Sequence, residues 1–177
     1  MNQLTVKTMK KYIVYGLFMT LAFVGFSSCL DDEPVFTDNG DYGIVELDLH
    51  GNRGSAPYAN RAVSRGNTTE INAIVNYTGV NGTPSDVTVT VEVDNAIVTA
   101  YNAYSRVTAL PAGSYELPSS NTLVIPKGQK TATYTIKLNT SALSNDVAVY
   151  AIGVKIASAT AGRISGNFGA GIYLVNK

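Results

Sequence analysis

Residues 87–93 read VTVTVEV, and this stretch decides the fold class. Valine occupies every second position, so the four valines point to one side of an extended chain while Thr88, Thr90 and Glu92 point to the other. Valine and threonine are β-branched residues, which favour a pleated strand over a helix. The stretch therefore predicts a strand with one buried face, and we expect Val89 and Val91 in a packed core.

The same alternation recurs elsewhere in the chain. Residues 44–49 and 69–77 alternate polar with apolar side chains, and each predicts a half-buried strand. Residues 147–157 form a long, nearly unbroken apolar run, which is typical of a central strand covered on both sides. A last strand is predicted over residues 170–175. These strands, with turn signals at short intervals, favour a two-sheet arrangement.

The middle of the chain combines a helix with a predicted hairpin. Asp94 and Asn95 supply an N-cap, and the apolar residues that follow recur at helical spacing up to the tyrosines at 101 and 104, of which Tyr101 is expected to point inward. Residues 122–125 and 131–138 flank a PKGQ turn, which predicts an antiparallel hairpin. About seven to eight strands with one short helix predict an all-β fold, an immunoglobulin-like two-sheet sandwich.

The first residues carry the pattern of an export signal. Three lysines precede an uncharged apolar run at residues 12–26. This run is shorter than the roughly 20 residues of a membrane span and suits a secretory signal. It ends in Phe26-Ser27-Ser28-Cys29, which resembles the lipobox of bacterial lipoproteins, in which the cysteine thiol takes a diacylglyceryl group. Residues 1–28 are therefore predicted to be a lipoprotein signal peptide, the alternative being that Cys29 is a free thiol after an uncleaved anchor.

An acidic triplet follows the predicted lipidation site. Asp31, Asp32 and Glu33 resemble the signal that sends Bacteroidetes lipoproteins to the outer face of the outer membrane. They also suit a solvated tether, because anionic headgroups repel carboxylates. We expect residues 29–41 to form a lipidated tether, residues 42–177 to form the sandwich domain, and the protein to be anchored in the outer membrane and exposed at the cell surface. Attachment facing the periplasm is the alternative.

The composition excludes several functional classes. From Cys29 onward the chain carries 10 basic and 13 acidic groups, so nothing in its charge favours nucleic acid. One cysteine and one histidine, His50, cannot supply a usual zinc site, and no G-x-S-x-G motif presents a serine. Glu46 and Asp48 point the same way on a strand, as expected of a solvated sheet face. We therefore expect no catalytic residue, no metal, no cofactor and no enzymatic activity.

Residues 90–138 support a family resemblance. They read TVEVDNAIVTAYNAYSRVTALPAGSYELPSSNTLVIPKGQKTATYTIKL, a strand, a capped helix, an LPAGSYEL segment and two further strands. This order resembles a domain of unknown function near the N-terminus of many Bacteroidetes surface lipoproteins encoded in polysaccharide utilisation loci. The resemblance covers about residues 42–175. It implies an immunoglobulin-like module with no assigned catalysis, commonly followed by a second domain that binds sugars or hydrolyses glycans.

From this resemblance we expect a non-catalytic surface lipoprotein that acts as an accessory glycan-binding or scaffold module, with polysaccharide or other glycan-utilisation proteins as partners. Residues 50–67 are predicted to be a long loop, and such loops are usually functional or disordered. Guanidinium groups recognise carboxylate and sulfate, and exposed aromatic rings stack on sugars. The candidate ligand contacts are Tyr58, Arg53, Arg61, Arg65 and Tyr115.

Two alternatives to this ligand site remain open at the level of sequence. Each tyrosine could lie at the rim of the core with its hydroxyl in water, and the loop could be a solvated insertion. The chain could also be an adhesive or fimbria-like structural subunit, in which cleavage after Arg61 or Arg65 frees a groove for strand exchange.

Overall fold

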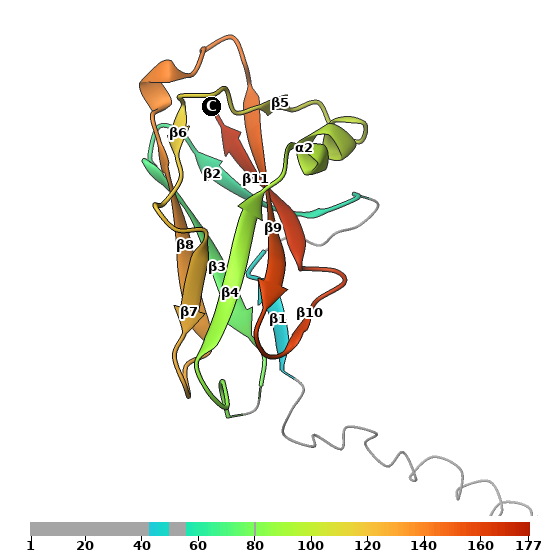
Figure 1. The fold of residues 1–177 in the computed structure, drawn as a ribbon. Helices are drawn as coiled ribbons and strands as arrows, with labels where there is room; N and C mark the ends of the chain where they lie inside the picture. Colours follow the sequence, from blue (N-terminus) through green and yellow to red (C-terminus); the bar gives the residue numbers. More distant parts are fainter. Residues whose placement is uncertain (1–42, 50–55, 80) are drawn as a thin grey trace, which may run out of the picture. The chain divides into compact units, whose positions relative to one another are not determined.

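The VTVTVEV stretch forms strand β4 (Val87–Val93) in the computed structural model of the chain (Figure 1). Val89 and Val91 are fully buried, whereas Thr88 and Thr90 are half-buried on the opposite face. Alternation along the strand therefore places its buried face as the sequence predicts.

The structure describes residues 43–49, 56–79 and 81–177, all of which belong to one compact unit. Several predictions fall outside these ranges and are not tested by the structure. They concern the signal peptide, the tether and four named sites, namely Cys29, the triplet Asp31, Asp32 and Glu33, His50 and Arg53.

The described strands form two sheets that enclose a common core, which confirms the predicted β-sandwich. The first sheet has the order β10-β1-β3-β8-β6, and the second has the order β2-β11-β9-β4-β7, with β5 paired to β9. The strands of the first sheet are β10 (Arg163–Ile164), β1 (Ile44–Leu47), β3 (Glu70–Tyr77), β8 (Thr131–Leu138) and β6 (Tyr115–Glu116). Those of the second are β2 (Ala59–Ser64), β11 (Ala170–Asn176), β9 (Val149–Ala159), β4, β7 (Thr122–Ile125) and β5 (Thr108–Ala109).

The inter-sheet core takes alternate apolar side chains from both sheets. On β3 the buried residues are Ile71, Ala73, Val75 and Tyr77, which lie on one face of the predicted strand, and β8 adds Tyr134 and Ile136. Burial raises the pKa of the Tyr134 hydroxyl above its ordinary value. Tight packing of β-branched and aromatic side chains between two sheets is the main source of stability in a fold of this type.

The predicted hairpin between residues 122 and 138 is wrong. Strand β7 pairs with β4 in the second sheet, whereas β8 pairs with β3 in the first, so the PKGQ turn crosses from one sheet to the other. The Thr83 side chain holds this turn, because its hydroxyl donates to the Pro126 carbonyl at 2.7 Å and its own carbonyl accepts from the Gly128 amide at 2.9 Å. Alternation shows that a strand has a buried face but does not say which strand lies beside it.

The predicted loop over residues 50–67 is also wrong in its second half. Residues 59–64 form β2, which runs parallel to β11 from the Ala59–Gly171 pair to the Ser64–Asn176 pair. The sequence ANRAVS does not predict this strand, because its polar side chains interrupt the alternation of apolar residues. Parallel pairing with a strand so far along the chain has no local turn signal.

Candidate functional site

A second, smaller hydrophobic cluster lies on the outer face of the second sheet. There the helix α2 (Asn95–Asn102) packs against β9 and β11 (Figure 1). We call this the α2 cluster; its buried residues are Ala56, Ile97, Val98, Tyr101, Ala151 and Ile172. Strand β9 therefore has apolar neighbours on both faces, as its long apolar run predicts.

The helix approaches the sheet closely because β9 has a glycine beneath it. A Cβ atom on Gly153 would lie 2.4 Å from the Asp94 carbonyl oxygen and 2.6 Å from the Ile97 Cβ. The Asp94 amide also donates to the Gly153 carbonyl at 3.0 Å. The contact thus fixes the start of α2 on the strand.

Asp94 is the N-cap that the sequence predicts. Its carboxylate accepts from the Ala96 amide at 2.9 Å and pairs with the Lys155 ammonium at 3.0 Å, while Glu92 lies 3.5 Å from the same ammonium. The Lys155 hydrogen bond, followed by that of Ala96, lowers the pKa of Asp94, and Asp94 in turn raises the pKa of Lys155. Because these charged groups remain partly open to solvent, their pairing orients the helix more than it stabilises it.

Tyr101 connects the helix to strand β2. Its ring is buried as predicted, with 4% of its surface exposed, and burial raises the pKa of its hydroxyl. The Asn60 side chain donates to that hydroxyl at 3.3 Å. The ring of Tyr104 meets the Tyr101 ring edge to face, with centroids 5.8 Å apart and planes at 68°. This geometry is one that aromatic pairs prefer.

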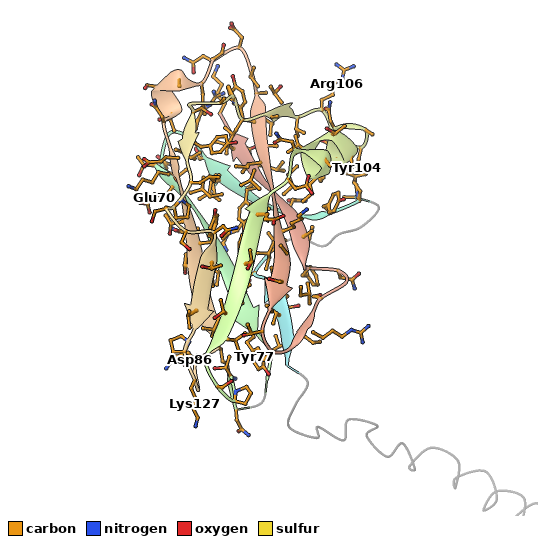
Figure 2. All side chains as sticks on the ribbon, viewed as in Figure 1. Glu70, Tyr77, Asp86, Tyr104, Arg106 and Lys127 are labelled. Carbon is orange, nitrogen blue, oxygen red and sulfur yellow. The ribbon has the colours of Figure 1, made fainter. Side chains whose placement is uncertain are left out.

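The segment after the helix holds Tyr104 in a fixed position. The amides of Tyr104 and Ser105 both donate to the Tyr101 carbonyl at 2.9 Å, and the Val107 amide donates to the Asn102 side chain at 3.0 Å. Residues 102–106 are nevertheless exposed, and Tyr104 shows 53% of its surface. Figure 2 shows Tyr104 and Arg106 on different sides of α2. We call residues 102–107 the Tyr104 loop.

The structure does not bring the predicted ligand contacts together. Tyr58 is half-buried against the α2 cluster, and Tyr115 lies on β6 at the edge of the other sheet, half-buried against the inter-sheet core. Neither tyrosine therefore lies in an open loop. Arg53 lies outside the described residues.

The two described arginines of the predicted loop have intramolecular partners. The Arg61 guanidinium lies 3.8 Å from the Asp48 carboxylate and donates to the Asp48 carbonyl at 3.4 Å. Arg65 donates to the carbonyls of Ser144 and Val147, and its guanidinium lies 5.7 Å from the centre of the Tyr150 ring. Their role in ligand binding stays a prediction, and the contacts of Arg65 show a structural role in holding the segment before β9.

Other kinds of site find little support within the part of the chain that the structure describes. No three acidic, histidine or cysteine side chains gather there in a way that could hold a metal ion. Burial, and secondarily the Asp48 charge, raises the pKa of Glu46, while the Asp48 carboxylate lies beside the Arg61 guanidinium. None of the described helices is long and apolar enough to cross a membrane.

Sequence reasoning placed Tyr104 on the helix but did not select it as a ligand contact. The structure shows that α2 ends at Asn102, so Tyr104 lies beyond the helix on a turn. The residue that could have indicated this helix end is Asn102, whose side chain accepts from the Val107 amide just beyond the helix. Tyr104 lies in the segment between them and is exposed.

Comparisons with known proteins agree with this fold. A family model described as "-like, N-terminal domain" matches residues 43–163, more than half of the chain. This match confirms the resemblance to an N-terminal domain that residues 90–138 indicate. No curated protein matches the chain in sequence.

Three solved Bacteroides structures share the fold at low sequence identity. A candidate carbohydrate-binding protein from Bacteroides ovatus superposes with a TM-score of 0.56 at 16% identity, over 75% of this chain and 36% of that protein. A multidomain B. ovatus protein that includes a domain of unknown function gives 0.56 at 15% identity, over 74% and 44%. EndoBT-3987 from Bacteroides thetaiotaomicron, solved with a Man5GlcNAc product, gives 0.51 at 16% identity, over 75% and 30%. The chain thus spans less than half the length of each of these three proteins.

Proposed function

The chain belongs to this family of N-terminal domains, and from that premise we propose that it is a non-catalytic accessory module of a glycan-utilisation system, anchored by lipid at the cell surface. The family match carries the proposal. The names of two structural relatives point the same way, since one is described as a candidate carbohydrate-binding protein and another was solved with an oligosaccharide product.

The described residues favour binding over catalysis. The neighbouring carboxylates Glu46 and Asp48 do not form an isolated acid–base pair, because the Arg61 guanidinium lies 3.8 Å from the Asp48 carboxylate. An exposed tyrosine on a fixed turn is, by contrast, a usual element of a carbohydrate contact. The chain would therefore hold or display a glycan for other proteins to process.

The proposed anchor is the diacylglyceryl-modified thiol of Cys29, followed by the acidic tether. The tether joins the domain at β1, which begins beside the turns at one end of the sandwich, whereas α2 lies toward the other end (Figure 1). The Tyr104 loop, which follows α2, therefore lies toward the opposite end of the described domain from the start of β1.

The anchor is tested by replacing its nucleophile. We expect the wild-type protein to incorporate labelled palmitate in a bacterial host and to fractionate with the outer membrane, and Cys29→Ser to lose the label and leave the membrane or remain as precursor. Protease added to intact cells should degrade the wild-type domain if it faces outward. A wild-type protein without label would contradict the lipoprotein assignment.

Glycan binding is tested by affinity electrophoresis of the full-length protein in detergent. Gels would contain a galactomannan, an arabinoxylan, a mixed-linkage glucan or an acidic pectin. Retardation in at least one gel is expected, and equal mobility in all of them would contradict a glycan-binding role. A triple Arg53→Ala, Arg61→Ala, Arg65→Ala variant would show whether the arginines recognise the acidic polymer.

The second candidate, an adhesive or fimbria-like subunit, has one observation in its favour. Strand β2 lies at the edge of its sheet, and among the described residues its only strand partner is β11. Edge strands are templates for pairing with another chain. SDS-resistant ladders and a mature N-terminus after Arg61 or Arg65 would favour this role, whereas a single band with residues 29–177 intact would exclude it.

A further inference from the structure

We propose that the Tyr104 loop is a sugar-stacking site, in which the ring of Tyr104 takes one face of a pyranose in a neutral glycan chain. This inference rests on the proposed glycan-binding function and names the side chain that would contact the glycan. No other described tyrosine combines comparable exposure with a fixed backbone: Tyr58 and Tyr115 are half-buried, and Tyr101 is almost fully buried.

The ring is exposed yet braced. Slightly more than half of its surface is open to solvent, while its remaining contacts include the edge-to-face arrangement with Tyr101. Tyr101 is held in turn by the Asn60 side chain and by the α2 cluster. An aromatic ring supported by a buried aromatic ring offers apolar area without a large loss of side-chain entropy when a ligand stacks on it.

The backbone beneath the ring is also preorganised. Three hydrogen bonds hold residues 102–107, two to the Tyr101 carbonyl and one to the Asn102 side chain. The loop therefore keeps its shape without a ligand, and binding costs little conformational entropy in its backbone.

The chemistry of the loop favours a neutral sugar. The C–H groups on one face of a pyranose match an aromatic face, and the exposed side chains of Asn102 and Ser105 could meet its hydroxyl groups. The loop has no carboxylate, and its single charged side chain, Arg106, lies on a different side of α2 from Tyr104 (Figure 2). The loop would thus recognise a sugar by the apolar face of the pyranose ring and not by a charged substituent.

The chain offers a sharp spectroscopic test, because it contains no tryptophan. Tyr104→Trp places the only indole of the protein at the proposed site and provides a larger stacking surface. Titration of the full-length variant in detergent with the galactomannan, arabinoxylan or mixed-linkage glucan should shift or quench the tryptophan emission in a saturable way. Leu117→Trp, at another exposed position, is the matched control and should give no change with the same glycans.

Affinity measurements complete the test. Tyr104→Ala should weaken binding to the retarding glycan by about tenfold or more, whereas Tyr104→Phe, which keeps the ring, should bind within about twofold of the wild type. Arg106→Ala should change neither the affinity nor its small salt dependence. Tyr104→Phe and Arg106→Ala should keep the wild-type melting temperature, whereas Tyr104→Ala loses the edge-to-face contact with Tyr101 and should melt slightly lower while staying folded.

The outcomes separate the site from the function. Wild-type retardation that persists in Tyr104→Ala overturns the site and leaves glycan binding in place elsewhere on the surface. Equal losses in Tyr104→Ala and Arg106→Ala, with strong salt dependence, overturn a stacked neutral sugar in favour of charge recognition. A wild-type protein that no glycan retards, and a Tyr104→Trp emission that no glycan alters, overturn both the function and the site.

Discussion

The inter-sheet core and the α2 cluster lie on opposite faces of the same two strands, β9 and β11. On β9, Ile152 and Val154 belong to the inter-sheet core while Ala151 belongs to the α2 cluster, and on β11 the neighbours Tyr173 and Ile172 divide in the same manner. The first cluster draws on both sheets, whereas the second has six buried residues and one short helix. The sandwich therefore depends on many redundant contacts, while the α2 cluster and the Tyr104 loop on its surface depend on a few.

The division of labour has a physical basis. Truncating an apolar side chain in the large core lowers the stability of the domain but need not unfold it, because the surrounding residues belong to several strands that still contact one another. The helix α2 has only eight residues, too few to be stable alone in water, so its place depends on the strand beneath it. Substitutions in the two regions should therefore differ in both size and consequence.

The largest effect is expected in the inter-sheet core. Val89→Asp buries an unpaired charge at a fully buried position and should lower the free energy of unfolding by about 4 kcal/mol or prevent folding. Thr88→Asp, on the half-buried outer face of the same strand, should lower it by less than about 1 kcal/mol. Urea denaturation of both variants measures the difference, and equal midpoints would show that the facing of β4 is wrong.

A smaller but more local effect is expected beneath the helix. Gly153→Val places atoms where the Asp94 carbonyl and the Ile97 side chain now lie, and should lower the free energy of unfolding by about 2 kcal/mol while displacing α2. Amide hydrogen exchange should accelerate in residues 95–107 and remain slow in β3 and β8. Gly166→Ala is the control, because an added Cβ there meets nothing within 4 Å. Uniform acceleration across both sheets would contradict a separate α2 cluster.

The smallest effect concerns the charge of the helix cap. Lys155 and the Ala96 amide lower the pKa of Asp94, so its contribution to stability is present above the ordinary carboxyl pKa of about 3.9 and is lost as the pH falls through the lower folded value. Asp94→Asn retains a capping acceptor but not the charge. Thermal melts between pH 2 and pH 7 should show a slightly lower melting temperature for Asp94→Asn near neutrality and convergence with the wild type in acid. If the melting temperatures of Asp94→Asn and the wild type instead diverged as the pH fell, the ionised Asp94 carboxylate would not be the stabilising form.

The same contrast explains what the sequence could predict. Alternation identified β1, β3 and β4, and the Asp94 N-cap identified the helix, because these signals are local. Strand partners were less accessible: the turn at residues 126–129 has hairpin chemistry but crosses between sheets because Thr83, from another loop, holds it. The contacts of Arg61 and Arg65 with Asp48 and Tyr150 join segments that no spacing relates. The exposure of Tyr104 depends on where the helix stops, which is the least certain feature of any helical pattern.

The parallel pairing of β2 with β11 has a consequence for the order in which the protein can be built. Ala59 and Gly171 are neighbours in the second sheet, although more than 100 positions separate them in the chain. The edge of that sheet therefore cannot close until the final strand has been synthesised. Long-range pairing of this kind slows folding, because the entropy of a large loop is lost before its contacts form. Strand β2, although it is among the first of the described strands to be synthesised, is therefore among the last to find its partner.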